Sequence, residues 1–163
     1  MVEFAMVAAP FLALLFAIAE TSLIFFAGQT LETATADSAR LILTGQAAGY
    51  DATAFKDQVC SRLHGLFGGT AGCKTNLMVD VRNYGKSFGT KPAKPTPDPV
   101  TGKLPDDFYD AGGPNCVVVV RVMYQWPVWV TLNGLDLSDV AKGKRLLMAT
   151  AAFRSEPYGT PTC

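Results

Sequence analysis

The chain has 163 residues, and 14 Lys and Arg balance 14 Asp and Glu, so its formal net charge is zero. This balance argues against nucleic-acid binding, which needs a basic surface to neutralise phosphates. Only 17% of the residues are charged, and His64 is the single histidine, which leaves little material for acid–base chemistry. The hydrophobic residues concentrate at the N-terminus and in two later runs rich in valine and leucine, which predicts an anchor followed by a domain.

The N-terminal stretch is apolar enough to cross a membrane. No residue from Phe4 to Ala19 is charged, and the apolar character resumes from Leu23 to Ala27. As one helix, Phe4 to Ala27 is about 36 Å long, which exceeds the roughly 30 Å hydrocarbon core. A buried core helix is one alternative, but the rest of the chain is small for surrounding so apolar a helix. A cleaved signal peptide is another, although its apolar region is usually shorter and follows a basic start. We predict a transmembrane helix over residues 1–27.

Three residues of this segment are unusual for a membrane helix. Pro10 removes one backbone hydrogen bond and predicts a kink, which membrane helices tolerate. Glu20 lies near the outer end of the span, where we expect a hydrated boundary residue. Glu3 opens the apolar run, and its carboxylate is costly in lipid unless a cation matches it.

The helical pattern continues past the span, because no proline or glycine pair interrupts it. One stripe carries Leu31, Ala34, Ser38, Leu41 and Ile42. We therefore predict that residues 28–48 extend the helix into one rod of about 44 residues, on the order of 66 Å long. Half of this rod would project from the membrane.

Residues 49–163 are predicted to form an extracytoplasmic α+β domain. Asp51 has the character of a helix N-cap, which predicts a short helix from Ala52 to about Leu66. Alternating and β-branched patterns predict strands over Asn76–Tyr84, Cys116–Trp126 and Leu146–Arg154. Because no helix separates these strands, the sheet should be antiparallel. The stretch 85–115 is rich in Pro, Gly, Lys and Asp, which indicates a long surface loop.

Two patterns could indicate a nucleotide site or a nucleophile, and both lack the required context. Residues 68–75 resemble the phosphate loop G-x-x-x-x-G-K-[ST], but Cys73 replaces the second glycine. A helix should also precede this stretch and a strand follow it, the reverse of the phosphate-loop arrangement. Cys60 and His64 lie four residues apart on one helical face without a recognisable Cys–His signature. We expect neither nucleotide binding nor catalysis.

The acidic residues of the loop do not predict a metal site. Asp106, Asp107 and Asp110 match no calcium-loop spacing, so we expect a solvated turn there. We therefore expect no metal, no cofactor and no enzymatic activity.

All four cysteines, Cys60, Cys73, Cys116 and Cys163, follow the predicted span, and their even number indicates an oxidising compartment. Four cysteines allow three pairings. The pairing with least nesting, in which the two closed loops do not overlap in the sequence, joins Cys60 to Cys73 and Cys116 to Cys163. The first bond would staple the short helix to the first strand, and the second would pin the C-terminal tail to the central strand. The alternative, free or partly metal-bound cysteines, lacks a Cys-x-x-Cys spacing in its favour.

Several short motifs follow one another along the chain. Residues 2–5 (Val-Glu-Phe-Ala) lead into the apolar helix with Glu20, and residues 60–63 read Cys-Ser-Arg-Leu. Residues 120–127 read Val-Arg-Val-Met-Tyr-Gln-Trp-Pro, and residues 151–158 read Ala-Ala-Phe-Arg-Ser-Glu-Pro-Tyr. In this order the motifs resemble the TadE-like minor pilins of the tight-adherence (type IVc) pilus, over nearly the whole chain except the long loop.

The resemblance implies a structural minor pilin or pilin-like assembly subunit. It implies a single pass through the bacterial inner membrane, with the C-terminal domain in the periplasm or in the extracellular pilus. The implied partners are other pilin subunits and the pilus assembly platform. Glu3 and Phe4 are the expected assembly residues, because the α-amino group of a neighbouring subunit is cationic near neutral pH and can match the Glu3 carboxylate. In the family, basic residues and a cleaved glycine precede this start, where this sequence has Met1.

Two other classes of protein remain open. A membrane-anchored extracytoplasmic binding module for surfaces or glycans would expose aromatic side chains near Tyr109, Trp126 and Trp129. A tethered enzyme would need a pocket with several convergent titratable groups, which the sequence does not offer.

Overall fold

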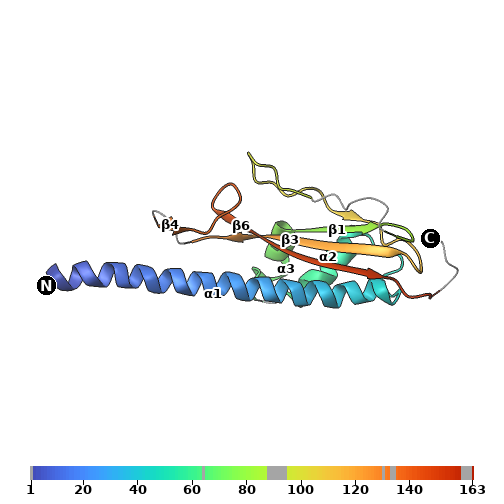
Figure 1. Cartoon of the computed structure of the whole chain (residues 1–163), viewed down its shortest axis with the longest axis horizontal. Helices are drawn as coiled ribbons and strands as arrows, with labels where there is room; N and C mark the ends of the chain where they lie inside the picture. The colour runs from blue at the N-terminus through green and yellow to red at the C-terminus, as the bar shows by residue number, and fades with distance from the viewer. Residues whose placement is uncertain (1, 64, 88–94, 130, 133–134, 159–162) are drawn as a thin grey trace.

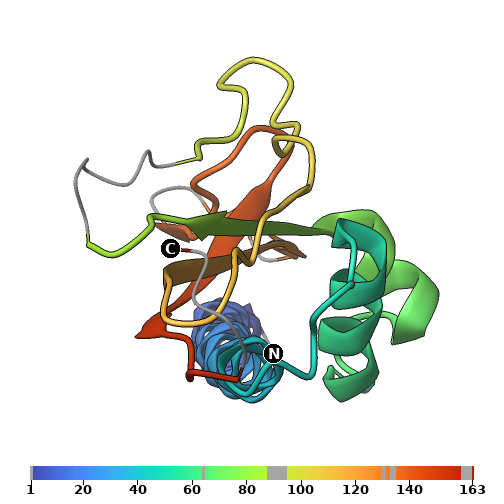
Figure 2. The ribbon, with the colours of Figure 1, turned by 90° about the vertical axis from the view of Figure 1, so that its right-hand side faces the viewer.

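The computed structural model describes residues 2–63, 65–87, 95–129, 131–132, 135–158 and 163. One long helix, α1 (Val2–Leu43), runs the length of the molecule, and a small sheet domain packs along its C-terminal half (Figure 1). Two short helices, α2 (Ala52–Arg62) and α3 (Gly69–Asn76), lie beside α1 on the same side of the sheet (Figure 2). The predicted α+β architecture with a long apolar helix is confirmed.

The main sheet has four strands in the order β2-β1-β3-β6. They are β1 (Leu77–Asn83), β2 (Phe108–Tyr109), β3 (Val117–Pro127) and β6 (Lys144–Arg154), and a separate hairpin is formed by β4 (Thr131–Leu132) and β5 (Leu135–Asp136). Strand β3 pairs antiparallel with both β1 and β6, whereas β1 and β2 are parallel. The prediction of a purely antiparallel sheet is therefore wrong at this edge. The stretch after β1 is long enough for the crossover that parallel pairing requires.

The core lies between one face of the sheet and one stripe of α1. The inward face of β3 carries Val118, Val120, Val122, Tyr124 and Trp126, all buried. The matching stripe of α1 is Ile24, Ala27, Leu31, Ala34, Ser38 and Ile42, also buried. Steps of three and four residues keep these side chains on one side of a helix. The stripe predicted from the sequence therefore faces the sheet, with Leu41 at its margin.

The helical layer differs from the prediction in one element. Asp51 caps α2, since its carboxylate accepts a 2.7 Å hydrogen bond from the Ala54 backbone N–H. The helix ends at Arg62, four residues before the predicted end. Helix α3 was not predicted, because its glycine- and threonine-rich sequence has low helix propensity. Its buried Cys73 ties it to the domain, and tertiary contacts override that propensity.

The outer face of the sheet is covered as well, by the chain that leads into β2. The Gln125 side chain on β3 donates a hydrogen bond to the Gly102 carbonyl oxygen. The Asp107 carboxylate accepts hydrogen bonds from the Val79 backbone N–H and from the Lys56 ammonium, both at 2.9 Å. Asp106, Asp107 and Asp110 are all exposed, as expected for a solvated turn, but Asp107 is also fixed by these two hydrogen bonds.

This cover buries an ion pair in the middle of the sheet. Asp80 on β1 is 1% exposed and lies opposite Arg121 on β3, which is 7% exposed. The Arg121 guanidinium is 3.4 Å from one carboxylate oxygen, and the Arg82 guanidinium is 2.7 Å from the other. Two cations thus match the buried carboxylate, as burial of a charge requires.

Candidate membrane and assembly surface

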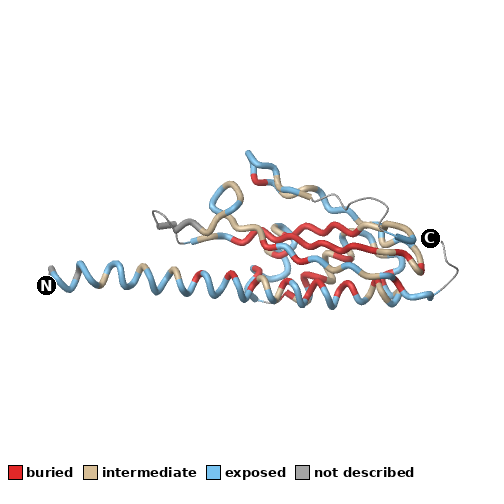
Figure 3. Tube along the Cα trace, in the orientation of Figure 1, coloured by how far each residue is buried: buried red, intermediate tan, exposed pale blue. Residues whose placement is uncertain are grey.

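The first half of α1 stands clear of the sheet domain (Figures 1 and 3). None of the described side chains between Glu3 and Ala19 is buried. The large exposed apolar residues there are Phe4, Met6, Val7, Phe11, Leu12, Leu14, Leu15, Phe16 and Ile18. They point to all sides of the helix, so no single face of the protein's own domain could cover them.

This helix has the properties of a membrane span rather than of a core helix. Among the described residues it is the one helix with sufficient length and hydropathy, and its most apolar window has a mean hydropathy of 2.1. Only 17% of that window is buried, whereas the core helix of a soluble domain would be mostly buried. The free half of α1 therefore needs a partner outside the described chain, either lipid or other apolar helices.

The sheet domain meets α1 at Glu20, where the free half ends. The Trp129 backbone N–H, just beyond β3, donates a 2.6 Å hydrogen bond to a carboxylate oxygen of Glu20. Glu20 is only 4% exposed, so the expectation of a hydrated boundary residue is wrong. The end of the sheet reaches back along α1 and encloses the carboxylate, which an N–H donor then stabilises.

A second contact fastens the opposite end of the domain to α1. The Glu156 backbone N–H, just after β6, donates a 2.9 Å hydrogen bond to the Leu43 carbonyl oxygen. Gly45 and Tyr158, each two residues further along the chain, also pack closely together, because a β-carbon added to Gly45 would lie 2.7 Å from the Tyr158 ring. The sheet is thus held along α1 at both ends, over about 35 Å of helix.

Glu3 and Phe4 lie near the free tip of α1, and both side chains are exposed. Phe4 is 80% exposed. The domain contacts α1 only from Glu20 onward. Glu3 and Phe4 are therefore not brought together with the cysteines or with the other residues singled out in the sequence. Their role in assembly stays a prediction.

Two disulfides join the pairs Cys60–Cys73 and Cys116–Cys163, with Cα atoms 5.8 and 5.5 Å apart. These are the pairs that the sequence predicted with least nesting. The first connects α2 to α3, rather than α2 to the first strand, because the unpredicted α3 holds Cys73. Cys60 is therefore a disulfide sulfur and not a thiol nucleophile, and His64 lies outside the described residues.

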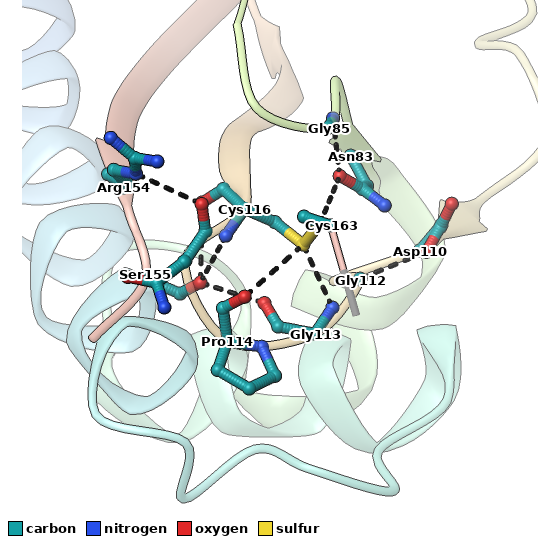
Figure 4. Close-up of a disulfide and its surroundings, with 11 residues drawn as sticks. Asn83, Gly85, Asp110, Gly112, Gly113, Pro114, Cys116, Arg154, Ser155 and Cys163 are labelled. Carbon is teal, nitrogen blue, oxygen red and sulfur yellow. Dashed lines mark hydrogen bonds between the residues drawn. A yellow bond between two sulfur atoms is a disulfide. The ribbon is translucent and has the colours of Figure 1, made fainter. Parts of the chain in front are cut away.

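The Cys116–Cys163 bond lies in a tightly hydrogen-bonded corner at the start of β3 (Figure 4). The Ser155 hydroxyl donates to the Gly113 carbonyl oxygen at 2.8 Å and accepts from the Cys116 backbone N–H at 3.1 Å. The Arg154 guanidinium donates to the Asn115 carbonyl oxygen at 3.0 Å. The corner therefore holds the end of β6 against the start of β3 beside the disulfide.

A hollow of about 270 Å³ lies at the end of the domain far from the free helix, and Tyr50, Tyr109 and Tyr158 line it. The Tyr109 hydroxyl donates a 3.2 Å hydrogen bond to the Ala47 carbonyl oxygen. Burial raises the pKa of Tyr109 to about 12, and the neighbouring Tyr158 and Tyr50 add to the shift. Within the described part of the chain, no three His, Cys, Asp or Glu side chains gather as metal ligands.

The aromatic residues singled out in the sequence have different environments. Trp126 is buried, with its ring edge-on to Phe67 at 5.8 Å, and Tyr109 is partly buried. Only Trp129 is largely exposed, at 66%, and it lies at the Glu20 end of the domain. The structure therefore does not bring these three aromatic residues into one exposed platform.

Comparison with known proteins relates the chain to one family. The model of the family described as TadE-like protein matches residues 1–40. The match ends inside α1, so the later motifs at 60–63, 120–127 and 151–158 lie outside it. No curated protein and no solved structure matches the chain. Residues 1–40, which contain the exposed apolar half of α1, are therefore similar to the TadE-like protein family.

Proposed function

We propose that this protein is a structural minor pilin or pilin-like assembly subunit of an adhesive type IVc pilus. One observation carries the proposal: an exposed apolar helix projects from a domain that covers only the rest of that helix. Such a surface is stable only against lipid or against other apolar helices. When the subunit leaves the membrane for the pilus, its apolar helix would exchange contacts with lipid for contacts with the helices of neighbouring subunits. The helix would not be exposed to water at either stage.

Packing between the helices of neighbouring subunits would also use the side of the domain where β6 lies along α1. A groove of about 390 Å³ runs between α1 and β6, and its lining includes Ile24, Phe25, Leu147 and Met148. Phe25 is 71% exposed at its rim. An apolar helix of a neighbouring pilin subunit laid beside α1 would cover these side chains.

We propose that α1 crosses the bacterial inner membrane once and that the C-terminal domain lies in the periplasm or in the extracellular pilus. The two disulfides support this orientation, because disulfides persist in oxidising compartments. A reporter that is active only outside the cytoplasm, fused after Cys163, should be active. An expressed but inactive fusion would reverse the orientation.

Within this mechanism, Glu3 and Phe4 act in assembly. A carboxylate at the start of an apolar helix is costly in lipid unless a cation lies near it. The α-amino group of a neighbouring subunit is such a cation. The exposed Phe4 ring beside it offers apolar contact area to the same neighbour.

The test is Glu3→Gln, which keeps the shape of the side chain and removes its charge. The matched control is Glu32→Gln, because Glu32 is exposed on the same helix, whereas Glu20 is engaged by Trp129. We expect the Glu3 variant to insert in the membrane and to impair piliation, with the control close to wild type. Normal piliation of a Glu3 variant present at wild-type level would contradict the assembly role.

One observation favours a second candidate function, a membrane-anchored binding module for surfaces or glycans. The tyrosine-lined hollow lies at the far end of the domain, where tyrosine rings and hydroxyls could contact a sugar. For this function, Tyr50→Phe, which keeps the ring that packs against the core and removes only the hydroxyl, should reduce surface adhesion while piliation and thermal unfolding stay unchanged. Unaltered adhesion of that variant would remove the support for a glycan site here.

A further inference from the structure

The length of the free helix sets the level at which the domain meets the membrane. From Val2 to Ala19 the helix is about 27 Å long, close to the roughly 30 Å thickness of the hydrocarbon core. When this stretch spans the bilayer, Glu20 lies near the outer boundary of the hydrocarbon. This step rests on membrane anchoring alone and not on the pilus role.

Trp129 is held at the same level. Its backbone N–H is 2.6 Å from the Glu20 carboxylate, so the residue cannot lie more than one side-chain length from this boundary. Its side chain is 66% exposed, and its indole meets the buried Trp126 edge-on with ring centroids 6.1 Å apart. A large amphipathic ring is thus presented outward on a rigid support.

The surroundings of Trp129 suit the headgroup region of a bilayer. The sequence carries no charge from Pro127 to Leu135. The Val128 backbone N–H donates a 3.1 Å hydrogen bond to the Gly143 carbonyl oxygen, and the exposed Lys142 precedes Gly143 in the sequence. Tryptophan rings and lysine ammonium groups are the side chains that anchor proteins at the membrane–water boundary.

We propose that the part of the domain formed by residues 127–129 and 142–143, beside the β4–β5 hairpin (Figure 1), is a lipid-contacting surface. The Trp129 indole lies among the headgroups of the leaflet from which α1 emerges, and the Lys142 ammonium lies beside their phosphates. The occupant is this bilayer, because Trp129 is hydrogen-bonded to Glu20, the residue at which the exposed apolar stretch of α1 ends (Figure 3 shows the burial along this helix). The domain therefore rests on the membrane, and the Glu20–Trp129 hydrogen bond sets its depth.

The chain has only two tryptophans, so fluorescence can test this directly. Trp126→Phe leaves Trp129 as the sole reporter, and Trp129→Phe leaves the buried Trp126 as its matched control. A third protein, with both tryptophans replaced by Phe and with Tyr158→Trp, reports on the far end of the domain. Each full chain is inserted in vesicles of phosphatidylcholine and phosphatidylglycerol that contain lipids spin-labelled either near the headgroup or at the end of the acyl chain.

We expect the label near the headgroup to quench Trp129 at least twofold more than Trp126 and than the reporter at position 158. The deep label should quench Trp129 less than the shallow one. If the chain inserts but Trp129 is quenched by aqueous iodide and not by lipid labels, the inference is overturned while anchoring stands. Shielding of Trp129 from both quenchers would also overturn it, because a second copy would then cover the ring. Failure of the chain to insert would remove the inference and the anchoring together.

Discussion

The backbone N–H of Trp129 lies 2.6 Å from a carboxylate oxygen of Glu20, across 109 residues of sequence. This bond joins the first residue after the free half of α1 to the segment just beyond the central strand β3. Because Glu20 is buried, the carboxylate depends on this donor for part of its lost hydration. The contact thereby fixes where the free half of α1 ends and the domain begins.

Removal of this contact should loosen the end of the sheet. A hydrogen bond to a charged group contributes about 1.5–3 kcal/mol, so Glu20→Ala should lower the free energy of unfolding by an amount in this range. Glu20→Gln keeps an oxygen acceptor and should cost less. Thermal unfolding in detergent and amide hydrogen exchange at Val128 and Trp129 measure the effect. Glu32→Ala on the same helix is the control, and an equal loss there would refute a specific role for Glu20.

Reduction of the disulfides should destabilise the domain unequally. The bonds close loops of sequence separation 13 and 47, for which loop entropy predicts about 3 and about 4 kcal/mol. The Cys116→Ser, Cys163→Ser double variant should therefore lose more stability than the Cys60→Ser, Cys73→Ser variant in chemical denaturation. Peptide mapping without reduction should recover Cys60 linked to Cys73 and Cys116 linked to Cys163. A peptide with Cys60 linked to Cys116 is incompatible with this sheet.

The buried ion pair on the outer face should be sensitive to the loss of one partner. Asp80→Ala leaves the buried Arg121 guanidinium without its carboxylate, which typically costs about 3–5 kcal/mol. The joint change Asp80→Leu with Arg121→Met removes both charges and should recover much of this loss. The exposed Asp106 offers a control, since Asp106→Ala should leave the unfolding temperature unchanged. A double variant no more stable than Asp80→Ala would contradict the pairing.

Stability should fall in alkaline solution through Tyr109. Its pKa is raised by burial from 10.0 to about 12, so its contribution is fully present below pH 10 and is lost as the pH rises toward 12. Tyr124, whose pKa burial also raises, adds to the same loss. Denaturation at pH 9 and pH 11 should show a smaller alkaline loss for Tyr109→Phe than for wild type. An unchanged difference between the two pH values would show that Tyr109 does not titrate in this way.

The turn that follows α1 should strongly favour glycine at position 45. Gly45 has φ +77°, where a side chain costs about 1–2 kcal/mol, and an added β-carbon would also meet the Tyr158 ring. Gly49 has φ +90° with no atom near an added β-carbon, so it carries the backbone cost alone. Gly45→Ala should therefore destabilise the protein more than Gly49→Ala in thermal unfolding. Equal losses would show that the tail does not pack closely on this turn.

Local patterns in the sequence determined the elements whose character depends on near neighbours. The uncharged run from Phe4 to Ala19 predicts a membrane helix because length and hydropathy suffice for that inference. Alternation predicted β1, the β-branched run predicted β3, and Asp51 predicted the start of α2 because its cap is a bond to residue Ala54. The even set of cysteines predicted two disulfides, since all four residues follow the span.

Tertiary structure alone decided the features that depend on distant residues. Helix α3 forms against its own low propensity because the Cys60–Cys73 bond and burial hold it. The parallel edge strand β2 and the covered outer face arise from a long return of the chain that no local period encodes. Glu20 is buried rather than hydrated because the Trp129 end of the sheet packs on it, and a hydropathy pattern along α1 contains no information about that partner.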